Sequence, residues 1–300
     1  MYEKYNHICE LIVQKGTSEN PMDVLTDDIC EFVIESSREI MDSFKADNIN
    51  IENMPNNIVL QLINTEQNKE MLENVPHREF EDLSVIYRWI AEKNEKGMYS
   101  TIVRQDMEDK AGMKEEELYK CALKNTKRML PVEIKSMADI ITDIMLNDII
   151  SSMPEELLEG ESIENVREQI MEEERELMNG PYPMYVITNE ERCYGAAEIL
   201  FNENLDKVSE IFHDDLYILP SSIHEVIAVP AKDCNVEELA TMVSGINSES
   251  VDIKERLSNQ VYFYDSKERK LSVATDTPNK RLDTDGTSQH ETDRDDRGVR

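Results

Sequence analysis

The sequence has little of what marks membrane, secreted or nucleotide-binding proteins. No window offers the roughly 18 uninterrupted apolar residues of a spanning helix, and the first residues lack the basic stretch and continuous apolar run of a secretory signal. Neither the Walker A glycine spacing nor the dinucleotide-binding spacing is present. These absences predict a soluble, cytoplasmic protein without a nucleotide or other cofactor.

Cysteine is scarce, and its spacing is not that of a metal or disulfide protein. The 5 cysteines never form a CxxC pair; they are Cys9, Cys30, Cys121, Cys193 and Cys234. A reducing compartment and no structural metal are therefore expected. Asp139 and Asp143 share a helical face, but no His or Glu is spaced to complete a metal site with them.

Positive charge is in short supply. The chain has 64 acidic and 32 basic side chains, which gives a formal net charge of -32. A field of this sign repels nucleic-acid backbones and anionic membranes, so direct binding to either is not expected. The charge suits a basic protein partner, or mimicry of a nucleic acid towards a protein that binds one. An ordinary acidic cytosolic protein has the same composition.

What is present predicts an α+β protein. The apolar content of 39% is enough for a packed core over most of the 300 residues. The predicted parts are a helix-rich N-terminal α+β lobe with a β-hairpin at residues 1–152, an acidic helix or linker at 153–180, a C-terminal α+β lobe at 181–273 and a disordered tail at 274–300.

In the first lobe, we expect a strand at 57–63, a hairpin of strands at 82–90 and 98–103, and helices at 115–126 and 134–150. Alternation along the first hairpin strand places Tyr87 and Trp89 on one face. Ile86, Arg88 and Ile90 fall on the other. The single tryptophan therefore fits a packing role better than ligand binding.

The second lobe is predicted as a mainly antiparallel sheet in the order ββαββαβ, with its two helices on one face. The ranges are 184–188, 194–201, 204–212, 216–220, 223–229, 236–246 and 260–264. Gly195 to Ala197 form a small-residue patch that another backbone can approach closely.

One stretch, DLYILPSSIHEVIAVP at Asp215 to Pro230, brings nucleophile, base and acid side chains together. On a strand beginning at Ile223, Ser222 and His224 share a face while Glu225 points to the other. This keeps a Ser-His hydrolase conceivable, with an orienting acid from elsewhere, such as Glu79 or Glu198. The competing interpretation is two buried strands whose polar bend satisfies backbone groups.

A second polar group, His77, Arg78 and Glu79, precedes the hairpin. A histidine beside a carboxylate and a guanidinium is suited to acid–base chemistry. The same residues also suit a loop that hydrogen-bonds itself into place. If both groups met in one pocket, a catalytic site would be favoured; if they lay apart, both would be structural.

Four stretches, taken in order, resemble one bacterial family. They are LINTEQNKEMLENVPHREFEDLSVIYRW at Leu62 to Trp89, LYKCALKNTKRMLPVEIKSM at Leu118 to Met137, MYVITNEERCYGAAEILF at Met184 to Phe201, and DLYILPSSIHEVIAVP. They are similar to domain of unknown function 5688, which is common in Clostridia and their relatives. The resemblance implies an α+β fold of unknown activity and carries over no catalytic residue or cofactor. Members usually have a longer N-terminal region, so it also implies a shortened first lobe here.

Together these observations favour a non-enzymatic cytosolic interaction or accessory protein with an acidic surface. The alternative is a hydrolase that uses the Ser222 and His224 face of the PSSIHE segment. A nucleic-acid mimic is a lesser alternative.

Overall fold

The computed structural model describes residues 51–94, 97–152, 163, 165–168, 170 and 183–275. The chain divides into two compact units, Met1–Asn53 and Met54–Arg300. Of the first unit only the 3-10 helix η2 (Ile51–Asn53) is described, so the fold given below is that of the second. Most of the acidic segment and the predicted disordered tail beyond residue 275 lie outside the described residues.

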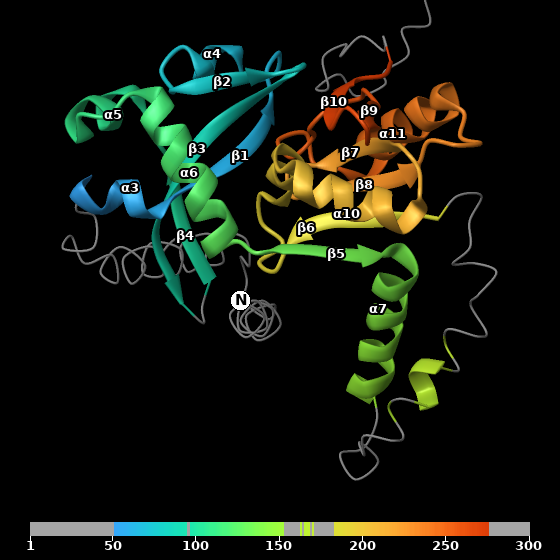
Figure 1. The fold of residues 1–300 in the computed structure, drawn as a ribbon. Coiled ribbons are helices and arrows are strands. Elements are labelled where there is room, and N and C mark those ends of the chain that lie inside the picture. Colours follow the sequence, from blue (N-terminus) through green and yellow to red (C-terminus); the bar gives the residue numbers. More distant parts are fainter. Residues whose placement is uncertain are drawn as a thin grey trace, which may run out of the picture. The chain divides into compact units, whose positions relative to one another are not determined.

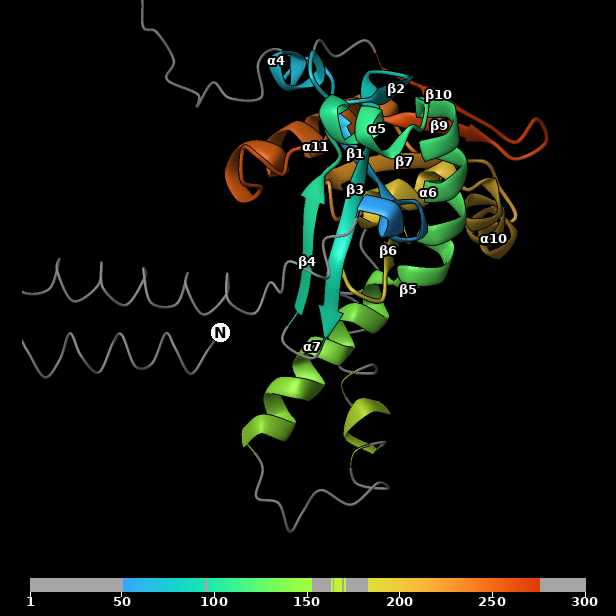
Figure 2. The same ribbon diagram turned by 90° about the vertical axis from the view of Figure 1, so that its left-hand side faces the viewer.

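The first sheet is antiparallel and is built around one long strand. Its strands are β1 (Ile58–Asn64), β2 (His77–Phe80), β3 (Leu83–Asn94) and β4 (Gly97–Ile102). β1 pairs along one edge of β3, with Ile58 opposite Trp89 and Asn64 opposite Leu83. β2 and β4 pair one after the other along the opposite edge (Figure 2). The predicted first strand and the predicted hairpin are confirmed.

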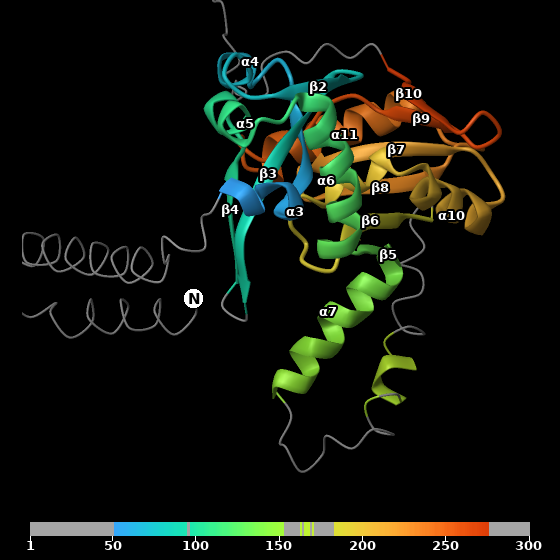
Figure 3. The ribbon, with the colours of Figure 1, turned by 60° about the vertical axis from the view of Figure 1, so that its left-hand side comes forward.

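Helices accompany this sheet. They are α3 (Met54–Asn57), α4 (Lys69–Leu72), α5 (Gln105–Ala111) and α6 (Glu115–Met129). α6 begins with three glutamates and ends with Lys127 and Arg128, the charge order that the helix dipole favours. It lies along β1 (Figure 3), where the Thr126 hydroxyl accepts a hydrogen bond from Leu60 N at 2.9 Å. A side chain thus satisfies a donor on an edge strand.

The second sheet has six strands in the order β10-β9-β7-β8-β6-β5, and all neighbours are antiparallel. They are β5 (Val132–Ser136), β6 (Tyr185–Asn189), β7 (Leu216–Ser222), β8 (Glu225–Pro230), β9 (Tyr262–Asp265) and β10 (Lys270–Val273). The α+β class is confirmed. β5 precedes the acidic segment, so this sheet uses chain from both sides of it; the domain boundaries at 152 and 180 stay a prediction.

The helices α10 (Asn202–Phe212) and α11 (Val236–Ser250) lie on opposite faces of this sheet (Figure 1), not on one face as the sequence predicted. The 3-10 helix η4 (Gly195–Leu200) comes just before α10 in the chain. Leu219 and Val229 pack with Leu239 of α11. On the other face, the Tyr264 hydroxyl donates to Asp206 of α10 at 2.7 Å. Both faces of this sheet carry apolar side chains, so each face is stabilised by packing against a helix that shields it from water.

Two predicted elements are wrong. Tyr194 to Phe201 is not a strand: Tyr194 adopts a left-handed conformation (φ 62°) and the following residues form η4. A short apolar run is compatible with a strand or with a helix, so periodicity alone cannot assign it. Here Gly195 lies directly against the backbone of Thr188 and of His224. The helix predicted at 134–150 begins later, as α7 (Met137–Ser152), because Val132–Ser136 pairs with β6 at the sheet edge.

The two sheets are held together by the segment that links α11 to β9. Asn64 of β1 donates from Nδ2 to Leu257 O at 2.9 Å. Asp82, between β2 and β3, accepts from the Ser258 hydroxyl at 2.6 Å and from the Tyr262 hydroxyl at 2.5 Å. Tyr262 is fully buried, and burial raises its pKa well above the ordinary value. These bonds tie Leu257, Ser258 and Tyr262, which follow residues 254–256, to the first sheet.

Candidate functional site

The polar bend of the PSSIHE segment is a tight turn between β7 and β8. Ser222 ends β7, Glu225 begins β8, and the two are direct cross-strand partners. His224 therefore lies in the turn and not on a strand, which corrects the predicted strand start at Ile223. The turn forms because the Ser222 hydroxyl accepts from His224 N at 3.0 Å and Ile223 N donates to Glu255 O at 2.9 Å.

Both ring nitrogens of His224 have partners. Nδ1 accepts from Tyr194 N at 3.3 Å, so the neutral ring carries its proton on Nε2. Nε2 faces the Glu255 carboxylate at 3.4 Å. The Tyr194 ring stacks on the imidazole at a centroid distance of 6.0 Å and an interplanar angle of 26°. The ring is held in place, and its side chain is still 28% exposed.

Gly195 is what allows this close arrangement. A Cβ at this position would lie 2.4 Å from His224 O and 2.8 Å from Thr188 Cα. The Thr188 hydroxyl donates to the same His224 carbonyl at 2.8 Å, and Ala196 N donates to Ile223 O at 3.3 Å. The predicted close approach of another backbone is therefore found, and the neighbour is the His224 turn itself.

The structure does not direct the Ser222 hydroxyl at the His224 ring. The hydroxyl is engaged by the backbone of the turn, and the ring nitrogens by Tyr194 and Glu255. Cys193, the other nucleophile nearby, is half-buried, and burial raises the pKa of its thiol. The Ser222 hydroxyl therefore lacks the geometry of an activated nucleophile, and its raised pKa makes the Cys193 thiol a poor one.

The group at His77, Arg78 and Glu79 lies on β2 and does not line the cavity that contains His224. Arg78 pairs with Glu115 of α6 at 2.9 Å and 3.1 Å, and with Glu116 at 2.6 Å. Its guanidinium also stacks on the Tyr119 ring at 3.9 Å.

The buried Tyr87 hydroxyl donates to the same Glu115 carboxylate. Burial and this bond raise the pKa of Tyr87, while the hydrogen bond to Glu115 raises that of Arg78. His77 bonds the Val75 carbonyl at 2.8 Å, and Glu79 is exposed. Arg78 therefore fastens β2 to α6.

A cavity of about 450 Å³ opens beside His224, between the first sheet and the segment 254–256. This is within the usual size range of small-molecule sites, about 300 to 1,000 Å³. Its polar lining comes from Gln61, Asn64, Asn68, Arg88, Tyr194, His224, Lys254, Glu255 and Arg256. Its apolar lining comes from Ile63, Met71, Ile86, Ile102 and Ile223. The predicted shared face of Ile86 and Arg88 is the face that meets this cavity.

Most of these lining residues were not identified from the sequence. Arg88 was assigned to a strand face but not to a site, and Lys254, Glu255 and Arg256 lie in a linker with no recognisable motif. The one usable signal was Arg88, a cation between the apolar Ile86 and Ile90 on one face of a strand.

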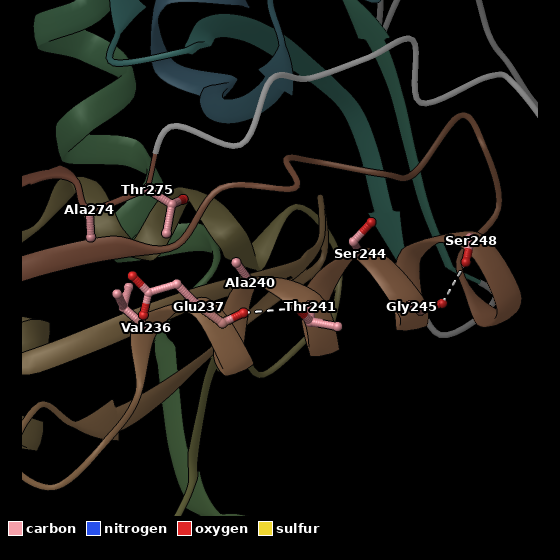
Figure 4. Close-up of a pocket in the computed structure, with 9 residues that line it drawn as sticks. All are labelled: Val236, Glu237, Ala240, Thr241, Ser244, Gly245, Ser248, Ala274 and Thr275. Atoms are coloured by element: carbon pink, nitrogen blue, oxygen red, sulfur yellow. Dashed lines mark hydrogen bonds between the residues drawn. The ribbon is translucent and has the colours of Figure 1, made fainter.

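Two further hollows lie elsewhere. One, of about 710 Å³, follows α11 and is lined mainly by small neutral residues and Glu237 (Figure 4). The other, of about 750 Å³, lies where α10 meets the β9–β10 turn, and carboxylates dominate its lining. Among the residues that the structure describes, no group of three or more His, Cys, Asp or Glu is placed to hold a metal ion. The described helices include none long and apolar enough to cross a membrane.

The chain matches the model of a family of unknown function, DUF5688, over residues 10–266. It belongs to this family. The match includes every residue that lines the cavity of this DUF5688 member. No curated protein and no solved structure matches the chain significantly.

Proposed function

We propose that the protein is a non-enzymatic binding protein of the bacterial cytosol that presents an acidic surface to a basic protein partner. The observation that carries the proposal is the groove where α10 meets the β9–β10 turn. It is lined by Asp206, Ser209, Glu210, His213, Asp214, Asp215, Ser266, Lys267 and Arg269. Its four carboxylates outnumber its two permanent cations, in keeping with the net charge of -32.

Several of these carboxylates are held in place before any partner arrives. Asp215 accepts from the Ser266 hydroxyl at 2.6 Å and from Ser266 N at 2.9 Å, and these bonds lower its pKa. Asp214 accepts from Lys232 N at 2.7 Å. Fixed carboxylate acceptors suit lysine and arginine side chains of a partner, because little side-chain entropy remains to be lost on binding.

A binding role is favoured over hydrolysis by the His224 geometry. A serine hydrolase needs its hydroxyl within hydrogen-bond reach of a histidine nitrogen that is free to take the proton. Here the Ser222 hydroxyl serves the backbone, and Tyr194 N occupies Nδ1. The hydrolase remains the alternative proposal: a Ser222→Ala variant that folds normally but loses ester hydrolysis shown by the native protein would support it.

The acidic groove is tested with a lysine-rich peptide, titrated at low and at high salt. We expect binding that weakens as ionic strength rises, because exposed charges are screened. Glu210→Gln, in the groove, should weaken the binding, whereas Glu249→Gln, on the exposed surface of α11, should not. Salt-insensitive binding, or equal effects of the two variants, would contradict the proposal. Crosslinking in cell lysate then identifies the natural partner.

A further inference from the structure

The cavity beside His224 has a local charge opposite to that of the chain. Three permanent cations, Arg88, Lys254 and Arg256, line it with one carboxylate, Glu255. In a protein with twice as many acidic as basic side chains, such a cluster is not expected from composition. A low-dielectric recess lined with one sign of charge concentrates ligands of the other sign.

Arg88 is positioned for a ligand by its own neighbours. Nε donates to the Ser100 hydroxyl at 3.0 Å, Nη2 to Ser100 O at 3.2 Å and Nη1 to Gln61 Oε1 at 3.2 Å. The Tyr194 ring lies against the guanidinium at 4.6 Å. Of the five N–H groups of a guanidinium, these three bonds to described residues leave two. The side chain is therefore oriented and still has donors to offer.

Lys254 and Glu255 are the exposed side chains of the lining. Among the ion pairs between described residues, none involves the Lys254 ammonium, whereas Glu255 faces His224. Arg256 is buried and donates to Val251 O at 2.9 Å, so it contributes its charge from a fixed position. An anion in this cavity can pair with the exposed Lys254 ammonium, while the Glu255 carboxylate opposes it electrostatically.

Part of the lining is apolar. Met71 and Ile102 are half-buried and keep some apolar surface accessible, whereas Ile63 and Ile223 are almost fully buried and Ile86 is fully buried. A purely inorganic anion would leave this wall without contacts. A ligand with a charged head and a short apolar body uses both kinds of surface.

We propose that this cavity binds a small organic anion, with a carboxylate or phosphate head directed at Arg88 and Lys254 and an apolar body against the isoleucine and methionine wall. The site is separate from the acidic groove at α10, since the two share no lining residue.

The test is isothermal titration with pentanoate, inorganic phosphate and pentylammonium at constant ionic strength. We expect the native protein to bind pentanoate, inorganic phosphate more weakly, and pentylammonium not at all. Lys254→Gln should weaken pentanoate binding about tenfold, the usual effect of losing one charge-assisted hydrogen bond. Glu255→Gln should tighten it, because a competing carboxylate is removed.

Matched controls are Lys270→Gln and Glu268→Gln, which make the same charge changes at exposed positions outside both the cavity and the acidic groove. Both should leave the affinity unchanged. The proposal is overturned if neither anion binds, if pentylammonium binds as well as pentanoate, or if the controls shift the affinity as much as the cavity variants. Circular dichroism confirms that each variant is folded.

Discussion

Replacing Glu198 by glutamine probes a buried carboxyl group. Glu198 lies on η4 and is 2% exposed. Oε2 accepts from Asn204 Nδ2 at 2.8 Å, while Oε1 is buried and has no hydrogen-bond partner within the described part of the chain. Burial raises the pKa of this carboxyl to about 7. The folded protein therefore keeps it protonated in mildly acidic solution.

The effect of Glu198 on the free energy of unfolding follows from the difference between its pKa values in the folded and unfolded states. The ordinary value of 4.5 rises to about 7, and each unit corresponds to about 1.4 kcal/mol. Below the unfolded pKa both states are protonated, so Glu198 adds no pH dependence. As pH rises from there through the folded pKa, the unfolded state binds fewer protons, and the free energy of unfolding falls. The total loss is on the order of 3 kcal/mol.

Urea denaturation of the native protein and of Glu198→Gln across this pH window measures the effect. Glutamine cannot ionise, so the stability of the variant relative to the native protein should rise by roughly 3 kcal/mol from acidic to mildly alkaline pH. Glu203→Gln is the control, because Glu203 lies nearby on α10 but is half-exposed and paired with Lys127. The hydrogen bond from Lys127 lowers the pKa of Glu203, so its effect should be small and of opposite sign. Parallel pH profiles of native protein and Glu198→Gln would refute the reasoning.

Two further substitutions test the packing around the site. Gly195→Ala should destabilise the protein by about 1 to 3 kcal/mol, because its Cβ would meet the backbone of Thr188 and His224; a midpoint unchanged in urea would contradict the close approach. Arg78→Ala should lower the free energy of unfolding by about 1 to 3 kcal/mol, because it removes the two-pronged bond to Glu115. Thermal unfolding measures this, and an unchanged midpoint would contradict the role of Arg78 in fastening β2 to α6.

The sequence was a good guide where a segment has one strong local pattern. The apolar run at Ile58–Asn64 and the alternation along Leu83–Asn94 gave strands at the expected places. It failed at Tyr194 to Phe201, where the same apolar residues fit a strand or a helix. The choice was made by the close approach of Gly195 to the backbone of Thr188 and of His224, and His224 lies almost thirty residues further along the chain.

The candidate site shows the same division. The sequence singled out His224 for its chemistry, and the residue does line a cavity. It predicted Ser222 as the companion, whereas the structure supplies Tyr194 and Glu255. Neither companion was predicted to lie beside the ring, since the spacing of residues along a loop does not report where the loop returns.

By itself, the sequence determined the α+β class, the strand and helix periodicities of most elements, the acidic charge and the family. These follow from local patterns and from composition, which need no knowledge of distant contacts. Only the tertiary structure decided that α10 and α11 cover opposite faces of one sheet and that Arg78 lies apart from His224. It also decided that Arg88, Lys254 and Arg256 line one cavity. The physical reason is that cations far apart in the chain meet only when two sheets and the segment between them pack together.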